Sequence, residues 1–501
     1  MSDPAVVVVG GGPSGLVVAS ELALAGVEVV VIERRTDVVQ SRAGTILPRV
    51  LELLDFRGLA QRFIDASAEI VANPLFRSHM WAGMKPVHWK HLDSRHGYRL
   101  VLPQNRTEEL LVRHAEEAGV RFLRGCTVTD VVQDDSGVVI GFTDEKGEAA
   151  QVRGAYAVGC DGGRSVVREK SGIAFEGHPP TFTGIVADVI MDESWPKGRR
   201  IVGNDRGWLA TFPFGEGITR FNLVHAERMH AGVSEEVTAE EVRRCLREIL
   251  ETDLTFERLH WASRFSDNTR IADRFASGRV FLVGESSRIH YPASGVGMNF
   301  CIQDAFNLGW KLAAVVNGHA APRLLATYES ERRPIAEALL RGVAAQCALQ
   351  FSFTPDGMAV KEWFESTILP IPEVNRRLAL ELNGLATPYP SSIEAGPLAG
   401  HRLPDVEFQL ADRLVTAAEL LRAQRMLALD LTGGDRFDGL SYEKAPVTVR
   451  AAVPVRAPEP LATATAVLVR PDGYVAWSSD RQDVGPADLR REVERWLACA
   501  H

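Results

Sequence analysis

The first 33 residues constrain the fold more than any other part of this chain. A run of valines at 6–9 is followed by Gly10-Gly-Gly-Pro-Ser-Gly15, an apolar segment, a second apolar run at 29–32 and Glu33. Two short apolar runs that flank a glycine turn and a longer apolar segment indicate a strand, a helix and a second strand. The N-terminus is therefore expected to form a β-α-β unit.

The glycines of this turn have separate tasks in such a unit. Gly10 permits the tight turn, Gly12 lets a pyrophosphate approach the backbone, and Gly15 lets the helix pack closely on the strand. The helix N-terminus presents free N–H groups to phosphates. Glu33 follows at close to the spacing of about 20 residues at which an acid binds a ribose hydroxyl. The pattern predicts a dinucleotide-binding site.

Other interpretations of the N-terminus fit less well. Residues 4–32 carry only Glu21 and Glu28 as charges, but these acids and the glycine cluster interrupt the roughly 20 apolar residues of a membrane span. The first four residues have no basic segment, which argues against a signal peptide. A generic glycine turn in an α/β protein is the remaining alternative. We expect a cytoplasmic protein that does not act at a membrane.

Composition narrows the class of protein. With 501 residues, 46% hydrophobic and 24% charged, the chain resembles a globular enzyme of two or three domains. The net charge of −9, without a basic run, argues against nucleic-acid binding. The six cysteines form no CxxC pair, so neither a metal site nor a redox dithiol is expected. Buried thiols in a reducing compartment are the simpler interpretation.

The rest of the chain indicates an α/β protein with an inserted sheet. A helix is expected at 107–119 with Thr107 as its N-cap, and then a meander of strands at 120–123, 127–132, 138–143 and 151–158. Residues 176–275 alternate polar and apolar side chains, which predicts an antiparallel sheet with strands at 184–191, 208–214 and 219–225 and a helix at 240–251.

The C-terminal half begins with a buried strand and long helices. The expected elements are a strand at 279–283 and helices at 297–317 and 324–350. Prolines and glycines at 388–397 indicate a linker. Beyond it we expect a small α/β unit with strands at 426–431, 466–470 and 474–477 and a helix at 486–498.

Three further motifs stand in a characteristic order, two of them after strands and the third at the start of a helix. They are Asp161-Gly-Gly-Arg-Ser-Val-Val-Arg168, Gly284-Glu-Ser-Ser-Arg-Ile-His-Tyr-Pro292, and Ala293-Ser-Gly-Val-Gly-Met-Asn299 with Gln303-Asp-Ala-Phe-Asn-Leu-Gly-Trp-Lys-Leu312. With the N-terminal glycines and Arg42-Ala43, they resemble the flavin-dependent aromatic hydroxylases, the class A flavoprotein monooxygenases. The segment 467–477 is similar to the C-terminal domain of the bacterial subgroup that acts on aromatic polyketides, such as angucyclines and anthracyclines.

The resemblance implies a fold and a division into domains. It implies a Rossmann-like, glutathione-reductase-like FAD-binding domain at 1–175, with substrate-side strands at about 73–102. An antiparallel-sheet substrate domain at 176–275 is inserted before a return segment with long helices at 276–390. A thioredoxin-like domain without redox cysteines is implied at 397–501.

The resemblance also implies the residues that hold FAD. Glycines and Glu33 contact its ADP half, and a loop at the start of the long helix runs along the isoalloxazine. The implied cofactor-binding residues are Gly10, Gly12, Pro13, Ser14, Gly15, Glu33, Arg34, Arg42, Gln104, Asp161, Gly162, Gly284, Glu285, Pro292, Gly295, Gly297, Met298 and Asn299. Asp161 and Gly162 match a motif that contributes to binding of both FAD and NAD(P)H.

This chain departs from the family pattern at four positions. The family usually has Asp at Glu285, His at Arg288, Pro at Tyr291 and Gly at Ser294. Glu285 keeps a carboxylate but adds a methylene, and Arg288 adds a fixed charge. These changes either weaken FAD retention, alter flavin movement or tune an unusual reaction. The alternative is neutral sequence drift at a surface that tolerates substitution.

The implied reaction is a monooxygenation. NADPH or NADH reduces FAD, O2 adds at C4a, and the hydroperoxide hydroxylates an electron-rich polycyclic aromatic polyketide in antibiotic biosynthesis. Arg42, Arg288, His290 and Pro292 are the candidate catalytic residues. The candidate substrate walls are Trp81, Trp89, Trp208, Phe212, Phe214, Phe221 and His225.

Other reactions remain open at this point. The scaffold also supports Baeyer–Villiger oxygen insertion, a flavin-dependent reductase without oxygen transfer, or a ligand-holding protein with a decayed flavin site. A monomer or a homodimer is expected, and the sequence does not distinguish NADPH from NADH.

Overall fold

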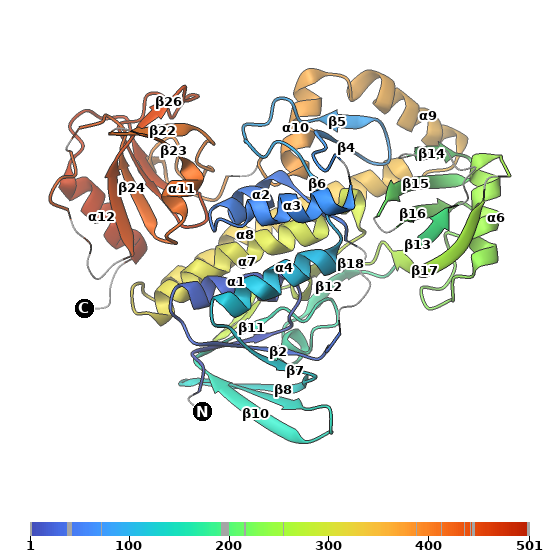
Figure 1. The fold of residues 1–501 in the computed structure, drawn as a ribbon, viewed down its shortest axis with the longest axis horizontal. Helices are drawn as coiled ribbons and strands as arrows, with labels where there is room; N and C mark the ends of the chain where they lie inside the picture. The colour runs from blue at the N-terminus through green and yellow to red at the C-terminus, as the bar shows by residue number, and fades with distance from the viewer. Residues whose placement is uncertain are drawn as a thin grey trace.

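The computed structural model describes residues 3–37, 43–71, 73–191, 200–214, 217–253, 255–386, 388–411, 413–434, 436–440, 442 and 446–497. The molecule is elongated (Figure 1). The C-terminal unit lies at one end and an antiparallel sheet at the other, with the long helices α7 (Gly297–Val316) and α8 (Arg323–Gln350) between them.

The N-terminal β-α-β unit is the centre of a six-stranded sheet. Its strand order is β19-β20-β11-β1-β2-β7, with β20, β11, β1, β2 and β7 parallel and β19 antiparallel to β20. The elements are β1 (Val6–Val9), α1 (Pro13–Leu24), β2 (Val29–Glu33), β7 (Arg121–Arg124), β11 (Tyr156–Gly159), β19 (Ala276–Ser277) and β20 (Val280–Leu282). The inner strands β1, β2, β11 and β20 are almost fully buried, as expected for a parallel sheet covered on both faces, whereas the edge strands β7 and β19 are partly exposed.

The predicted meander is divided between two sheets. The strand expected at 151–158 is two strands, because Gly154 ends the first and the chain then joins β1 through β11. The antiparallel sheet contains β8 (Thr127–Asp134), β9 (Gly137–Thr143) and β10 (Ala149–Gly154). The preceding helix α4 (Gln104–Glu117) begins after Pro103, so the expected N-cap at Thr107 is wrong.

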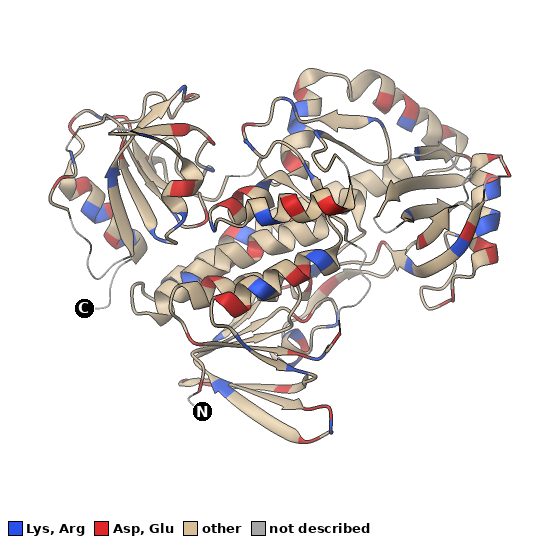
Figure 2. Cartoon of the chain, viewed as in Figure 1, with Lys and Arg blue, Asp and Glu red and all other residues tan. Residues whose placement is uncertain are grey.

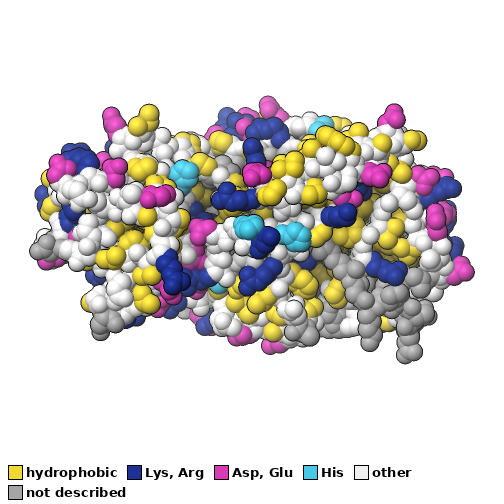
Figure 3. Space-filling model, turned by 90° about the horizontal axis from the view of Figure 1, so that it is seen from above, with side chains coloured by type: hydrophobic (Ala, Val, Ile, Leu, Met, Phe, Trp, Pro, Cys, Tyr) yellow, Lys and Arg dark blue, Asp and Glu magenta, His cyan; other side chains and the backbone are white. Residues whose placement is uncertain are grey.

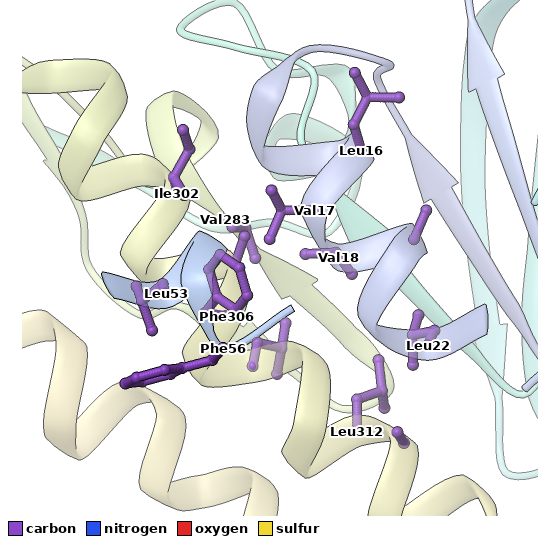
Figure 4. Packing of buried hydrophobic residues seen from close by; sticks show 14 of the residues in the cluster. Leu16, Val17, Val18, Leu22, Leu53, Phe56, Val283, Ile302, Phe306 and Leu312 are labelled. Atoms are coloured by element: carbon purple, nitrogen blue, oxygen red, sulfur yellow. The ribbon is translucent and has the colours of Figure 1, made fainter. Parts of the chain in front are cut away.

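Helices α1 and α7 form the packed centre of the cofactor-side region. Figure 4 shows Val17 and Val18 of α1 pointing toward Phe306 of α7, with Leu53 near the same ring. At Gly309 a Cβ atom would lie 2.6 Å from Cβ of Glu21, so only glycine permits this helix–helix approach. The neighbouring helices are α2 (Pro48–Asp55) and α3 (Ala60–Ile70).

The inserted region contains a five-stranded antiparallel sheet of order β14-β15-β16-β13-β17. Its elements are β13 (Thr183–Met191), β14 (Arg200–Asn204), β15 (Gly207–Pro213), β16 (Ile218–His225), α6 (Ala239–Leu250) and β17 (Phe256–Ser266). Three of these strands and the helix match the sequence prediction. The apolar side of α6 covers one face of the sheet, packing on Leu209, Phe221 and Leu223. The other face is turned toward the rest of the molecule.

Smaller elements connect these regions. Two prolines at helix position N1 begin helices that the sequence analysis did not predict, α9 (Pro355–Trp363) and α10 (Pro372–Leu382), joined by the π-helical turn η3 (Phe364–Ile368). The short strands are β3 (Thr45–Ile46), β4 (Ser78–Met80), β5 (Pro86–His88), β6 (Leu100–Val101), β12 (Phe175–His178), β18 (Thr269–Ala272) and β21 (Arg288–Ile289), and the short helices are α5 (Val166–Lys170), η1 (Gly284–Ser286), η2 (Ala293–Gly295) and η4 (Ile393–Ala395).

The C-terminal unit is built on a mixed sheet of order β25-β24-β27-β28 and a second sheet of order β23-β22-β26. Its elements are β22 (Glu407–Leu410), β23 (Arg413–Thr416), α11 (Ala417–Leu421), β24 (Met426–Asp430), β25 (Val447–Ala451), β26 (Val453–Val455), β27 (Ala466–Val469), β28 (Val475–Ser479) and α12 (Pro486–Leu497). The strands predicted near 426, 466 and 474 and the closing helix are present. Its likeness to thioredoxin stays a prediction.

A buried charged cluster joins this unit to α7 and α8. Arg470 donates to both carboxylate oxygens of Glu331, at 2.7 and 2.9 Å, and Lys311 Nζ lies 2.7 Å from Glu331 Oε2. Arg470 also pairs with Asp472, which accepts a hydrogen bond from the Trp310 indole N–H. We call Trp310, Lys311, Glu331, Arg470 and Asp472 the interdomain cluster.

Surface charge is mixed in sign. Figure 2 shows acidic and basic residues side by side on exposed helices such as α4 and α12. On the face seen in Figure 3, both signs are scattered between hydrophobic side chains. Within the described ranges, no helix is both long and apolar enough to cross a membrane. The same residues contain no group of three or more His, Cys, Asp or Glu arranged to hold a metal ion.

Candidate active site

A groove of about 650 Å³ follows the carboxyl ends of β1, β2 and β11. This edge is where ligands bind in open parallel sheets. The groove is lined by Gly10, Gly12, Pro13, Ser14, Glu33, Arg34, Arg35, Gln104, Glu108, Cys160, Asp161, Gly162, Glu285, Met298 and Cys301, among others. Most of the cofactor residues proposed from the sequence therefore lie around one groove.

The glycines of the first turn differ in what surrounds them. A Cβ atom at Gly10, where φ is +103°, would lie 2.4 Å from the Cys160 carbonyl oxygen. A Cβ atom at Gly15 would lie 1.9 Å from the Gly10 carbonyl oxygen, so Gly15 brings α1 against the turn and does not itself line the groove. At Gly12 no atom stands within 4 Å of such a Cβ. The space beside Gly12 is open to a ligand.

Glu33 is held by the turn that it faces. Its Oε2 accepts a 2.6 Å hydrogen bond from the Gly11 N–H, and its Oε1 accepts from the Arg35 backbone N–H at 2.8 Å. Burial opposes ionisation of the carboxyl, but the hydrogen bonds and charge of Arg35 and the Gly11 N–H lower its pKa overall. A carboxylate at this position is ready to accept a hydroxyl donor.

Asp161 lines the groove and fixes the conformation of the second motif. Its Oδ1 accepts from the Ser165 hydroxyl at 2.5 Å and its Oδ2 from the Val167 N–H at 3.1 Å, at the start of α5. Burial raises the pKa of the carboxyl. Arg168 then donates to the Ser286 carbonyl at 2.9 Å, which ties this motif to the segment that begins at Gly284.

A second cavity continues the groove into the interior. It has a volume of about 410 Å³ and shares Gln104, Glu285, Met298 and Cys301 with the groove. One side is formed by residues 288–298 and the opposite side by the inner face of the inserted sheet. A molecule that occupies the groove can therefore extend one end into this cavity.

Arg288, one of the family departures, is fixed on the cofactor side of the cavity. Its Nη1 lies 2.5 Å from Asp304 Oδ2, and Arg332 Nε lies 2.6 Å from Asp304 Oδ1. Arg332 also donates to the Tyr389 hydroxyl at 3.1 Å. Desolvation opposes the charge of Arg288, but Asp304 raises its pKa overall. The guanidinium is a permanent positive charge at the cavity wall.

His290 is neutral at physiological pH. Burial, together with the positive charge of Arg288, lowers its pKa to about 4. Its Nδ1 lies 2.6 Å from the Tyr291 carbonyl oxygen, so Nδ1 carries the proton and Nε2 is an acceptor. His290 and Pro292 both line the cavity.

The loop along the start of α7 contributes mainly backbone. Gly295, Gly297 and Met298 line the cavity. Asn299 is fully buried behind it, where Oδ1 accepts from the Leu47 N–H at 2.8 Å and Nδ2 donates to the Thr45 carbonyl at 2.9 Å. Asn299 therefore fixes the loop against β3.

Gly284 lies outside both cavities at a φ of +72°, and its Cβ would stand 2.6 Å from Ser14 Oγ. Arg42 falls outside the described residues. The residues that follow it, 43–45, line the inner cavity.

The inserted sheet divides the proposed aromatic walls by register. Trp208 and Phe212 point from one face of β15 into the cavity, and Phe214 follows them there. Phe221 pairs with Thr211, not with Phe212, so it points to the opposite face and is buried under α6. Because side chains alternate along a strand, a one-residue difference in phase decides the face.

Three other proposed walls also lie away from the cavity. Trp81 stacks on Phe364 with ring centroids 5.4 Å apart, and Trp89 is 1% exposed within the core around α10. His225 Nε2 lies 2.7 Å from Glu248 Oε2 of α6. Trp81, Trp89, Phe221 and His225 therefore pack as structural residues, because their elements face other parts of the molecule.

The cavity also contains residues that the sequence analysis did not propose. They are His79, Met80, Arg99, Val186, Arg220, Asn222, Phe265, Tyr291, Ser294 and Gln350. Arg220 and Asn222 were recoverable, because they alternate with Phe221 and face the same side as Phe212. Arg220 forms a buried bidentate pair with Asp188, at 2.7 and 2.8 Å, and stacks over Phe214 at 3.6 Å.

Comparison with known families identifies the two parts of the chain. Residues 3–343 match the FAD binding domain family, and residues 396–500 match the aromatic-ring hydroxylase C-terminal family. The chain belongs to the FAD-dependent aromatic-ring hydroxylases. It is an FAD-dependent monooxygenase of mixed α/β fold, as its resemblance predicted.

Relatives along the whole chain agree with this assignment. A 12-dehydrotetracycline 5-monooxygenase/anhydrotetracycline 6-monooxygenase of Streptomyces rimosus is 38% identical, covering 98% of each chain. A rifampicin monooxygenase of Streptomyces venezuelae is 37% identical over 99% of each chain. The solved structure of an anhydrotetracycline hydroxylase from Streptomyces rimosus has a TM-score of 0.87 at 37% identity and covers 99% of both chains.

The residues of the groove fit FAD. The N-terminus of α1 has no side-chain cap, so its first N–H groups face the open space beside Gly12. Glu33 lines the groove with an ionised carboxylate that could accept a ribose hydroxyl, and the groove opens into a cavity bordered by the start of α7. A flavin ring entering this cavity would meet backbone N–H groups and Arg288.

Proposed function

We propose that this monooxygenase hydroxylates an electron-rich ring of a polycyclic aromatic polyketide with NADPH or NADH and O2. The observation that carries the proposal is the continuity of the FAD groove with a cavity of about 410 Å³ that has aromatic side chains on one wall. The relatives named for tetracycline and rifampicin substrates support a large fused-ring substrate. When bound, FAD supplies the transfer of electrons to O2 and of oxygen to the substrate.

In this proposal the backbone around Gly12 and the α1 N-terminus bind the diphosphate, and Glu33 accepts a ribose hydroxyl. Residues 292–298 and Arg288 border the flavin ring. Fixed positive charge and helix N–H groups favour the electron-rich reduced cofactor. His290, being neutral, can accept a proton at Nε2.

Trp208, Phe212 and Phe214 are proposed to hold the flat substrate opposite the cofactor. Arg220, whose charge Asp188 balances, is proposed to donate a hydrogen bond to a phenolate or enolate form of the substrate, and such an ion is a better nucleophile toward oxygen. In the proposed division at 175, 275 and 390, the segment 176–275 supplies these three aromatic residues.

The test is incubation of purified protein with FAD, NADPH, 18O2 and a panel of polycyclic aromatic polyketides. We expect one heavy oxygen atom in the product, attached as a ring hydroxyl. If the heavy oxygen atom were instead inserted between a ketone carbon and its neighbour, the reaction would be a Baeyer–Villiger oxidation and not a hydroxylation. NADPH-dependent conversion without heavy oxygen would contradict oxygen transfer.

A further inference from the structure

Ser294 occupies a backbone conformation that serine rarely adopts. Its φ is +51° and its ψ 18°, inside the short helix η2, in the left-handed region that favours glycine. Glycine is the residue that the family pattern leads one to expect here. A side chain at this position imposes backbone strain, so an interaction of that side chain must offset it.

The Ser294 side chain connects two separate elements. Its hydroxyl, which has one proton, shares a three-centre hydrogen bond between the Met80 carbonyl oxygen of β4, at 3.1 Å, and Gln346 Oε1 of α8, at 2.9 Å. Gln346 Oε1 also accepts from the Ala82 N–H at 3.3 Å. Glycine would satisfy the backbone conformation but would lose this shared hydrogen bond.

The backbone of Ser294 is bound to the same strand. His79 Nε2 lies 2.7 Å from the Ser294 carbonyl oxygen, and a carbonyl only accepts, so His79 carries its proton on Nε2. His79 and Met80 line the cavity, as Ser294 does. Ser294 therefore links the cofactor-facing loop to the cavity wall through two bonds to neighbouring residues of β4.

The opposite side of this loop is fixed independently. Asn299 Nδ2 donates to the Thr45 carbonyl at 2.9 Å and to the Gly295 carbonyl at 3.3 Å. The loop is thus held by Asn299 toward β3 and by Ser294 toward β4 and α8. We call the Ser294 contacts with β4 and α8 the Ser294 clamp. Asn299 holds the loop against β3, and the Ser294 clamp sets the distance between the loop and the cavity wall at β4.

We propose that Ser294 is a positioning residue that fixes the distance between the cofactor-facing loop and the wall containing His79 and Met80. This proposal rests on the proposed function, because it assigns the separation of flavin and substrate to one side chain. Oxygen transfer requires the reacting atoms to be held close together. Loss of the clamp diverts electrons from NADPH to O2, and the two electrons and two protons then leave as hydrogen peroxide.

The experiment uses two variants that separate strain from bonding. Ser294→Ala keeps the Cβ and its strain but loses the hydroxyl, and Ser294→Gly loses both. Glu251→Gly is the matched control, since Glu251 has a φ of +52° at the exposed end of α6, away from the cavity. Each protein is compared for FAD dissociation constant by flavin fluorescence, thermal stability, and product formed per NADPH consumed.

Both Ser294 variants are expected to bind FAD about three- to tenfold more weakly, the effect of one lost hydrogen bond. Both also release more hydrogen peroxide per NADPH, although Ser294→Gly is the more stable of the two. The control keeps wild-type FAD affinity and coupling. Unchanged FAD affinity in both Ser294 variants, with altered thermal stability only, would overturn the proposal. Absence of labelled product from the wild type would instead contradict the proposed function, and the FAD titration would still decide the role of Ser294.

Discussion

The cofactor groove and the substrate cavity share four residues but are built by different means. The groove lies at strand ends, where Gly10 and Gly15 determine how closely chain segments approach and Gly12 leaves space for a ligand. The cavity is made of side chains from β4, β15, β16, α8 and the loop before α7. Binding of a common cofactor thus depends on local geometry, whereas binding of a particular substrate depends on which side chains distant segments bring together.

The strongest test of this difference lies in the glycine turn. We expect Gly15→Ala not to accumulate as folded protein, because its Cβ would lie 1.9 Å from the Gly10 carbonyl oxygen. Even without a backbone clash, overpacking costs about 1–3 kcal/mol. Gly12→Ala should fold with wild-type apoprotein stability and bind FAD about 100-fold more weakly, a loss of about 2.8 kcal/mol. Thermal denaturation and FAD titration measure the two effects, and equal behaviour of the variants would contradict the separate roles.

A second test concerns the buried carboxylate of Asp304, which holds Arg288 at the cavity wall. Asp304→Asn removes the carboxylate that pairs with both Arg288 and Arg332, and all three side chains are buried. Removing one partner of a buried pair costs about 3–5 kcal/mol. We expect urea denaturation to show a loss of this size. Asp483→Asn, at an exposed pair with Arg481, is the control and should leave stability unchanged.

A third test separates the two faces of the inserted sheet. Phe221→Ala should destabilise the protein by about 3–5 kcal/mol, because the ring is fully buried under α6. Its KM for substrate should stay unchanged. Phe212→Ala should do the reverse, raising KM about tenfold with little loss of stability. Steady-state kinetics and thermal melting measure the two effects. If the register of the strand were shifted by one residue, Phe221→Ala would raise KM and Phe212→Ala would lower the stability.

The smallest effect is expected from His290. Its pKa in the folded protein is about 4, below the ordinary 6.5, so the unfolded chain binds a proton that the folded protein does not. Apoprotein stability should therefore fall as the pH decreases from about 6.5 to about 4, by on the order of 1–3 kcal/mol. His290→Asn should flatten this part of the profile. Urea denaturation from pH 4 to 7 measures the stability of both proteins. If the wild type and His290→Asn lost stability equally over this range, groups other than His290 would cause the loss.

The groove was more predictable than the cavity for a physical reason. The turn at Gly10, the acid at Glu33 and the motif at Asp161 are short segments whose tasks depend on their own backbone. Phe221 was placed among the substrate walls because aromatic content does not reveal the phase of a strand. Trp89 is likewise not a wall of the cavity, because it is buried against α10, and the sequence does not show that this helix covers it.

Some missed features did carry a local signal. Thr354 caps α9 and Pro355 begins it, and Pro372 begins α10, a pattern typical of helix starts. Contacts such as Ser294 with Gln346 and Arg288 with Asp304 join segments through side chains. They require the three-dimensional arrangement of α7 and α8, which a single sequence does not contain.

The interdomain cluster has a consequence for recombination between relatives. Arg470 and Asp472 lie on one side of the linker at 388–397, while Trp310, Lys311 and Glu331 lie on the other. A chimera with its crossover in that linker would inherit half of a buried charge network from each parent. A hybrid whose parents differ so that one charge of this network loses its partner should be less stable by about 3–5 kcal/mol, so the five positions form one unit for the design of such exchanges.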